Sequence, residues 1–293
     1  MLNQAQQILL KLPKPIAKAA KALFTYPRYW VCCARARKGY QAHGDQYSHP
    51  VLFVAGMPKS GTTWVEQMLS SFSGYEAILI PEATFSELKT GEGHCFEMPK
   101  TALSRFRRKL VLTKMHVPGT ENNGQILRDA SVPCLILHRD LRDVSISHYY
   151  YVRNTPWHGD YNALENATVE EGIEYFIRNR LGEFIQWIDG WERWRDPNAS
   201  IVVRYEDLLK DASHNMKQIL SLFGLSVDDE QLESIVAAYD FKSLRAKNSA
   251  TGFFRKGTSG DWQNHYTPEL QELFKRFSGD YLIRYGYELN LDW

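Results

Sequence analysis

The segment Pro58–Trp64 contains the residues of this chain best suited to binding chemistry. It reads Pro-Lys-Ser-Gly-Thr-Thr-Trp and follows directly on the apolar run Val51–Ala55. A loop between a buried strand and a helix aims backbone N–H groups and the positive end of the helix dipole at one point. Lys59 adds a full charge there, and Gly61 lets the backbone approach a ligand closely. The segment therefore predicts a site for a phosphorylated ligand.

A nucleoside triphosphate loop is the rival interpretation of this segment. Gly56 and Gly61 have the spacing of the two glycines in G-x-x-x-x-G-K-[ST]. Thr62 stands where that motif needs its lysine, and Lys59 lies in the middle of the loop, so its ammonium would meet a ligand from another direction. A nucleotide-dependent kinase acting on a small molecule is therefore the alternative, and a non-catalytic nucleotide-binding or scaffold protein is a third reading.

Three segments, in this order along the chain, resemble the sulfotransferases that use 3′-phosphoadenosine 5′-phosphosulfate (PAPS). The loop at Lys59 is close to their 5′-phosphosulfate pattern PKSGTTW, residues 138–147 resemble their 3′-phosphate motif, and residues 254–262 match their RKGxxGDW segment. The shared pattern runs from about Val51 to about Tyr266 and resembles the cytosolic-type branch best. The resemblance implies an enzyme that moves a sulfuryl group from PAPS to an acceptor hydroxyl or amine and releases 3′-phosphoadenosine 5′-phosphate (PAP).

The resemblance also implies how the matched residues hold the donor. Lys59 would neutralise charge on the bridging oxygen as the S–O bond breaks. The amides and hydroxyls around the 5′-phosphate would come from Ser60, Gly61, Thr62 and Thr63. Aromatic faces give adenine a stacking platform, and the aromatic residues assigned to adenine are Trp64, Phe241 and, through a hydrogen bond, Tyr205. The 3′-phosphate would be held by Arg139, Ser147, Arg255, Lys256 and Gly257.

The catalytic base is predicted at His116, which matches the catalytic histidine of the family. Lys114 and His116 end a strand-like run, and residues two apart on an extended chain point to the same side. The imidazole would take the acceptor proton while Lys114 stabilises charge on the sulfuryl oxygens. By analogy with phosphoryl transfer we expect in-line displacement. We expect no metal, because the donor carries less charge than a triphosphate and no paired-carboxylate site is evident.

Alternating strand and helix signals predict the scaffold that positions these residues. Apolar runs predict strands at 51–55, 77–80, 109–114, 132–138 and 200–205. Helical spacing and helix-starting residues predict helices at 62–72, 141–152, 169–194, 213–223, 228–239 and 268–285. This alternation predicts a three-layer α/β/α fold with a central, mainly parallel sheet and a P-loop-like loop, in which ligands bind at the carboxyl ends of the strands.

Length and composition agree with a single sulfotransferase domain at 46–293 behind a basic leader at 1–45. Of the 293 residues, 44% are hydrophobic and 24% are charged, which allows a sizeable core. The net charge of +1 gives no indication of a nucleic-acid partner. The charge is uneven, because residues 1–45 hold eight cations and one anion.

The leader predicts a cytoplasmic protein. It has no apolar h-region leading to a cleavage site, and no stretch of the chain is apolar enough to span a bilayer. The four cysteines lack metal spacing, so we expect reduced thiols: Cys32, Cys33, Cys95 and Cys134.

Residues 14–28 of the leader have the spacing of a basic amphipathic helix. A 3.6-residue period places one set of residues opposite another: Lys14, Lys18, Lys21 and Arg28 against Ile16, Ala19, Ala20 and Leu23. Two interpretations stay open. The helix makes peripheral contact with an anionic membrane, or it packs its weak apolar face on the domain.

The acceptor is a small or lipid-like molecule that the sequence does not name. Residues 72–98 and 149–171 are rich in aromatic side chains and are expected to decide its identity. Residues 245–253 are fewer than the substrate-covering loop expected from small-phenol members of the family, which indicates a more open site. Only Thr267 and Glu272 remain of the dimer motif of cytosolic members, so the oligomeric state stays open.

Overall fold

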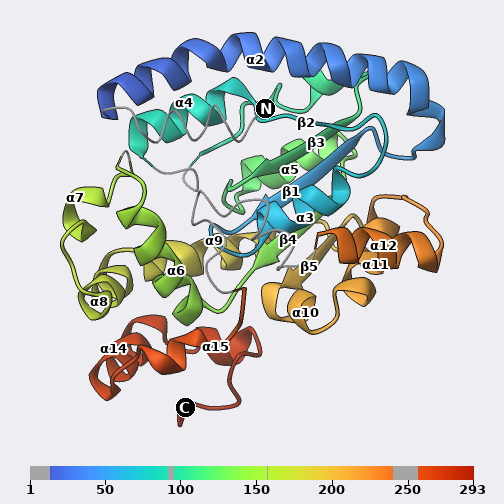
Figure 1. The fold of residues 1–293 in the computed structure, drawn as a ribbon. Coiled ribbons are helices and arrows are strands. Elements are labelled where there is room, and N and C mark those ends of the chain that lie inside the picture. The colour runs from blue at the N-terminus through green and yellow to red at the C-terminus, as the bar shows by residue number, and fades with distance from the viewer. Residues whose placement is uncertain (1–13, 92–95, 157, 240–256) are drawn as a thin grey trace.

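A five-stranded parallel sheet forms the centre of the molecule. A computed structural model describes residues 14–91, 96–156, 158–239 and 257–293 (Figure 1). The strands are β1 Val51–Gly56, β2 Glu76–Ala77, β3 Val111–Met115, β4 Cys134–His138 and β5 Ser200–Arg204. They lie in the order β2-β3-β1-β4-β5, and every neighbouring pair is parallel. The chain leaves β1 with β3 on one side and β4 on the other, so a topological switch point lies at its carboxyl end.

Helices cover both faces of this sheet. The helices before residue 180 are α2 Lys14–His43, α3 Thr62–Leu69, α4 Pro81–Thr90, α5 Glu121–Asp129, α6 Leu141–Arg153, α7 Tyr161–Leu164 and α8 Val169–Asn179. Those after it are α9 Leu181–Trp194, α10 Tyr205–Lys210, α11 Ala212–Leu222, α12 Asp229–Ala238, α14 Pro268–Ser278 and α15 Tyr281–Arg284.

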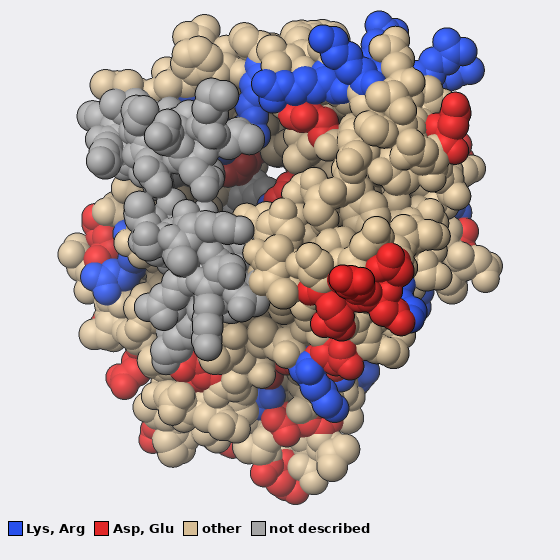
Figure 2. Space-filling view, turned by 45° about the vertical axis from the view of Figure 1, so that its right-hand side comes forward, with Lys and Arg blue, Asp and Glu red and all other residues tan. Residues whose placement is uncertain are grey.

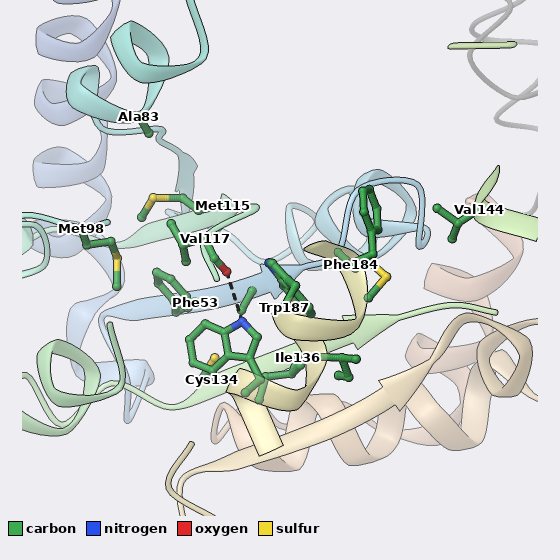
Figure 3. Close-up of a cluster of buried hydrophobic side chains, with 14 of the residues drawn as sticks. Phe53, Ala83, Met98, Met115, Val117, Cys134, Ile136, Val144, Phe184 and Trp187 are labelled. Atoms are coloured by element: carbon green, nitrogen blue, oxygen red, sulfur yellow. Dashed lines mark hydrogen bonds between the residues drawn. The ribbon is translucent and has the colours of Figure 1, made fainter. Parts of the chain in front are cut away.

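The two faces of the sheet belong to two separate hydrophobic cores. Along β1, Phe53 and Ala55 point into one core and Leu52 and Val54 into the other, because successive side chains of a strand alternate between faces. Helices α6, α8, α9 and α14 contribute to the first core, and α3, α11 and α12 to the second. Figure 3 shows part of the first core, with Phe53 of β1 and Trp187 of α9 among its members. The predicted three-layer α/β/α fold is confirmed.

Two predicted boundaries were wrong for a local reason. The strand expected at 77–80 ends at Ala77, because Pro81 begins α4 and Ile80 serves as its N-cap. The helix expected at 169–194 breaks at Arg180, whose φ of −126° is not helical and separates α8 from α9.

The last predicted helix also stops early. It was expected at 268–285, but α14 ends at Ser278 because Gly279 adopts a φ of 56°, a left-handed conformation that glycine tolerates. A short helix, α15, follows. The helices α4 and α5 were not predicted.

The leader is one long helix that packs on the domain. Helix α2 extends beyond the predicted 14–28 to His43, and it runs along α4 at the top of the molecule in Figure 1. Its inner face adds Tyr29, Cys32, Cys33 and Ala36 to the first core. Among the described residues, no helix has the length and apolarity needed to cross a membrane.

Three of the four cysteines lie within the described residues. Cys32, Cys33 and Cys134 are buried and carry no disulfide. Cys95 lies outside the described residues.

Candidate functional site

The loop between β1 and α3 has a backbone that only certain residues tolerate. Lys59 and Gly61 adopt φ values of 70° and 81°, in the left-handed region. A Cβ added to Gly61 would lie 2.7 Å from the ring of Tyr205, so a side chain there would displace an aromatic residue of the site. The hydroxyl of Ser60 donates to the carbonyl oxygens of Met57 at 2.6 Å and Leu137 at 3.1 Å, which fastens the loop to β4. Ser60 thus shapes the loop through its own hydroxyl.

Three cations predicted for the site lie near one another around this loop. The backbone oxygen of Lys59 is 3.5 Å from Nη1 of Arg139. Burial, and then the charges of Arg139 and Lys114, lower the pKa of Lys59 to about 7. The Nζ of Lys59 lies 4.1 Å from the centre of the Tyr151 ring, a cation–π contact. A bound anion would relieve the repulsion among these cations, as expected of a ligand site.

Lys114 occupies a different position from Lys59. Its Nζ forms an ion pair with Glu66 of α3 at 2.8 Å and donates to the hydroxyl of Thr63 at 3.3 Å. Thr62, the first residue of α3, is buried and precedes Thr63 at the start of the helix. Both threonines therefore lie where β1, β3 and α3 meet.

His116 follows β3 and faces the end of β1. The register pairs Ala55 with Met115, which places the next residue of the β3 chain beside Gly56. The Nδ1 of His116 lies 2.5 Å from the carbonyl oxygen of Gly56. Because a carbonyl only accepts hydrogen bonds, Nδ1 carries the hydrogen and Nε2 is the basic nitrogen. Trp187 holds the backbone of His116 by donating from Nε1 to its carbonyl oxygen at 2.9 Å.

Aromatic side chains gather on the other side of the loop. The rings of Trp64 and Tyr205 meet edge to face with centroids 6.5 Å apart, and the guanidinium of Arg139 lies 4.3 Å from the Tyr205 ring centre. Nε1 of Trp64 and Nε of Arg139 are buried, with no hydrogen-bond partner in the described part of the chain. Buried donors of this kind usually have partners. The indole N–H of Trp64 and the Nε of Arg139 are therefore suited to donate hydrogen bonds to a polar, aromatic ligand.

Arg139 also joins this cluster to the C-terminal segment. Its Nη2 donates to the carbonyl oxygen of Thr258 at 2.8 Å and to Asp143 at 3.2 Å. Asp143 in turn accepts hydrogen bonds from the backbone N–H groups of Gly260 at 2.8 Å and Trp262 at 2.9 Å. The described part of the matched segment, residues 257–262, is thus fastened to the start of α6.

The remaining predicted residues are less well placed by the structure. Ser147 lies in α6 and is partly exposed, and Gly257 adopts a φ of 66° just before Thr258. Phe241, Arg255 and Lys256 lie outside the described residues.

Two residues of the site were missed by the sequence analysis. Tyr151 falls in the aromatic-rich segment 149–171, but nothing in the neighbouring sequence indicates that it lies over Lys59. Glu206 follows Tyr205 at the carboxyl end of β5, a position where α/β sheets bind ligands, and this signal was available. Burial raises the pKa of Glu206 to about 7, and its carboxylate accepts the N–H of Asp140 at 3.1 Å.

One side-chain cluster has the composition of a metal site. His148, His158 and Asp160 are buried, with one potential ligand atom each within 4.8 Å of one another. The carboxylate of Asp160 already accepts hydrogen bonds from the Arg180 guanidinium, including Nε at 2.9 Å, and from the Tyr175 hydroxyl at 2.8 Å. A metal cation would have to displace the arginine, so the cluster fits an internal ion pair better than a metal.

Comparison with known proteins agrees with this geometry. Residues 49–286 match the family described as the sulfotransferase domain. Human sulfotransferase 1C2 is 25% identical over 249 residues, covering 76% of this chain and 80% of its own. Bovine sulfotransferase 1A1 is 26% identical over 299 residues, covering 92% of this chain and 94% of its own.

Solved structures share the fold. Mouse sulfotransferase SULT7A1, in complex with PAP, has a TM-score of 0.59 and 20% identity, over 78% of this chain and 84% of its own. Retinol dehydratase, in complex with androsterone and PAP, has a TM-score of 0.58 and 17% identity, over 84% of this chain and 85% of its own. The family does not favour the kinase alternative. Because the family match extends over most of the chain, this protein belongs to the sulfotransferase family and is a transferase of the sulfuryl group.

Proposed function

We propose that the enzyme transfers the sulfuryl group of PAPS to a hydroxyl or amine of a small, apolar acceptor by in-line displacement, with His116 as general base. The observation that carries the proposal is the hydrogen bond between Nδ1 of His116 and the carbonyl of Gly56, at the start of the phosphosulfate loop. This hydrogen bond fixes the orientation of the His116 ring. The basic nitrogen, Nε2, is therefore directed away from the Gly56 carbonyl.

The atoms balance in one step. Nε2 of His116 takes the proton from the acceptor, whose oxygen or nitrogen forms a bond to sulfur while the bond from sulfur to the bridging oxygen breaks. Lys59 then faces the charge that develops on the PAP leaving group, and Lys114 faces the sulfuryl oxygens. PAP and the sulfated acceptor are the products. We propose that Lys59 and Lys114 stabilise the charge that develops in this step and that no metal takes part.

The donor would lie across the carboxyl ends of β1, β4 and β5. Arg139, Ser147 and Gly257 would hold its 3′-phosphate together with Arg255 and Lys256, and Trp64, Tyr205 and Phe241 would hold adenine. Structural neighbours are PAP complexes, which supports PAPS as the donor. The buried donors of Trp64 and Arg139 support the proposed placement independently.

The acceptor class is inferred from two observations. A structural neighbour, retinol dehydratase, is described with androsterone in one structure and with retinol in another. In this chain, Tyr151 lies over Lys59, and its pKa is raised to about 12 by burial and then by the charge of Glu87 of α4. Helices α4 and α6 would thus form walls of an apolar acceptor site beside the donor loop.

The donor assignment is tested by calorimetric titration of the full chain, without added metal, with PAP and separately with ADP, ATP and Mg²⁺-ATP. Clear preference for PAP is expected. Preference for Mg²⁺-ATP would overturn the proposal and favour the alternative function, a nucleotide-dependent kinase.

The base is tested by turnover with PAPS and an acceptor found in a screen of apolar alcohols and amines. His116→Ala is expected to lower kcat by about 10²- to 10⁴-fold while PAP affinity is kept. His214→Ala, an exposed histidine of α11, is the matched control and should leave turnover unchanged. A His116→Ala enzyme with unaltered kcat would remove His116 from the mechanism.

A further inference from the structure

The outer face of α2 exposes an unusual amount of apolar surface. Five large side chains, here called the α2 stripe, are between 51% and 71% exposed: Ile16, Leu23, Phe24, Trp30 and Val31. Single exposed apolar residues are normal on a protein surface, but a contiguous group marks an interaction site.

The stripe is continuous along the helix. Ile16, Leu23 and Trp30 are spaced seven residues apart, as are Phe24 and Val31, and residues seven apart lie on nearly the same side of an α-helix. The two rows are adjacent. Their next positions, one heptad further, are Arg37 and Lys38, both exposed. The stripe therefore ends in two cations.

The rest of the outer face carries positive charge only. Helix α2 contains no Asp or Glu, and its C-terminal half exposes Arg35, Arg37 and Lys38. Figure 2 shows Lys and Arg side chains gathered along the top of the molecule, over α2. The Arg35 side chain is 63% exposed even though it forms an ion pair with Glu76 at 3.6 Å. An approaching surface would meet apolar and cationic groups together.

The inner face of α2 makes the contacts that the fold needs. The Nζ of Lys18 donates to the carbonyl oxygen of Leu88 at 3.0 Å, and Lys21 pairs with Glu87 at 3.0 Å, so these two cations point toward α4. The predicted packing of the face that bears Ile16 and Leu23 on the domain is therefore not what the structure shows. That face is directed away from the domain.

We propose that the outer face of α2 docks on the surface of an anionic phospholipid bilayer. The α2 stripe enters the boundary between headgroups and acyl chains, where an indole such as that of Trp30 is favoured. Arg35, Arg37 and Lys38 meet the lipid phosphates. The helix lies in the plane of the membrane, along its length of about 45 Å.

Charge complementarity decides between a membrane and a second copy of this chain. A symmetric contact through the stripe would bring the same cations of both copies together, with no acidic residue on α2 to neutralise them. An anionic lipid surface neutralises every one of them. The α2 stripe contains none of the residues assigned to the donor or to the base, so docking can be measured without turnover and independently of the proposed reaction.

The test is co-sedimentation of the full chain with phosphatidylcholine vesicles, with and without phosphatidylserine. Binding is expected only with phosphatidylserine present. The triple variant Leu23→Ser/Phe24→Ser/Trp30→Ser should lower the partition coefficient by about tenfold or more. Leu289→Ser, which changes a 97% exposed apolar residue at the other end of the chain, is the matched control and should have no effect.

A second variant separates charge from apolar contact. Arg35→Gln/Arg37→Gln/Lys38→Gln should lower partition by roughly fivefold for each cation removed, and added salt should have the same effect on the unmodified chain. PAP affinity and the circular dichroism spectrum, measured on each variant, should be unchanged.

Two results would overturn the proposal. One is equal partition of the unmodified chain and the triple variant onto anionic vesicles. The other is a chain that is dimeric by light scattering and becomes monomeric when the stripe is substituted, which would make the stripe an interface between copies.

Discussion

Two clusters of buried charge lie beside one another in this enzyme, and they are built in opposite ways. Around Asp160, a single carboxylate accepts hydrogen bonds from Arg180, Tyr175 and His148, which hold its pKa well below the usual range. Around Lys59, burial and then the charges of two neighbouring cations, Arg139 and Lys114, lower the pKa of the lysine. The first cluster is neutralised by the chain itself. The second is arranged so that an anionic ligand can neutralise it.

Tyr151 contacts a residue of each cluster. Tyr151 of α6 lies over Lys59 and meets the ring of His158 edge to face, with centroids 5.8 Å apart. Asp160, at the start of α7, holds α6, α8 and α9 together through its three partners. The difference indicates a division of labour, in which the Asp160 cluster stabilises the wall and the Lys59 cluster binds the donor. Variants can separate the two roles.

The largest expected effect is on stability, in Asp160→Asn. Arg180 would keep its ion pair with the more exposed Glu183 at 3.2 Å but lose the buried carboxylate, and removing one partner of a buried ion pair costs about 3 kcal/mol of the free energy of unfolding. PAP affinity should change little. Because the folded-state pKa of Asp160 is lowered, its contribution to stability is present above the unfolded pKa of about 4 and is lost as the pH falls below it.

Denaturant unfolding at pH 7 and at acid pH checks this prediction. Glu174→Gln is the matched control, since its pair with Arg178 is on the surface and should contribute less than about 0.5 kcal/mol. If Asp160→Asn kept its stability but lost PAP affinity, Asp160 would belong to the binding site. The distinction between a stabilising cluster and a donor-binding cluster would then be wrong.

The next largest effect is on donor affinity, in Arg139→Ala. Loss of the guanidinium should weaken PAP binding by about 2 kcal/mol or more, and should weaken ADP binding much less, because only PAP carries the 3′-phosphate. Asp143 keeps its hydrogen bonds from the N–H groups of Gly260 and Trp262, so stability should fall less than in the Asp160 variant.

Calorimetry with both nucleotides checks the Arg139 prediction. Arg139→Lys keeps the charge but not the planar fork and should recover only part of the affinity. Equal losses for PAP and ADP would contradict the assignment of Arg139 to the 3′-phosphate.

A smaller effect of opposite sign is expected in Lys59→Met. Burial and neighbouring cations oppose the charge of Lys59, so its removal should raise the free energy of unfolding at pH 7 by about 1 kcal/mol, while PAP affinity falls. Lys114→Met is the matched control: Lys114 has Glu66 as a partner at 2.8 Å, and its loss should not stabilise the fold. Thermal unfolding of both variants distinguishes them, and a destabilised Lys59→Met would contradict the comparison.

The same contrast explains which features the sequence could predict. The donor loop, its flanking strands and the segment at 257–262 are local motifs, in which residue type and spacing carry the geometry. The Asp160 cluster joins residues from α6 to α9, and no pattern in the chain indicates that Arg180 would leave the helix and pair with Asp160. Tyr151 over Lys59 was missed for this reason, because the contact depends on the path of α6 and not on local spacing.

Helix α2 shows the limit of periodicity in another way. The 3.6-residue pattern correctly predicted a helix with Lys18 and Lys21 opposite Ile16 and Leu23. Which face would be buried could not be predicted, because it depends on Glu87 and the carbonyl of Leu88 in α4, a helix that the sequence did not indicate. Near its N-terminus the helix is held to α4 by these polar contacts, whereas its C-terminal half buries the apolar residues Tyr29, Cys32, Cys33 and Ala36.

The smallest and most specific effect expected of the Lys59 cluster is proton uptake on donor binding. With a pKa of about 7 in the free enzyme, Lys59 is about half protonated at pH 7, and the bound anion favours the charged form. Binding should therefore take up roughly half a proton at pH 7, and PAP affinity should weaken by up to about tenfold per pH unit above it. Calorimetric enthalpies in buffers of different ionisation enthalpy measure the uptake, and Lys59→Met should abolish it. Asp160→Asn should leave the proton uptake intact, because that carboxylate is ionised throughout this pH range. Uptake that is lost in Asp160→Asn and kept in Lys59→Met would assign the proton to the Asp160 cluster and contradict the prediction.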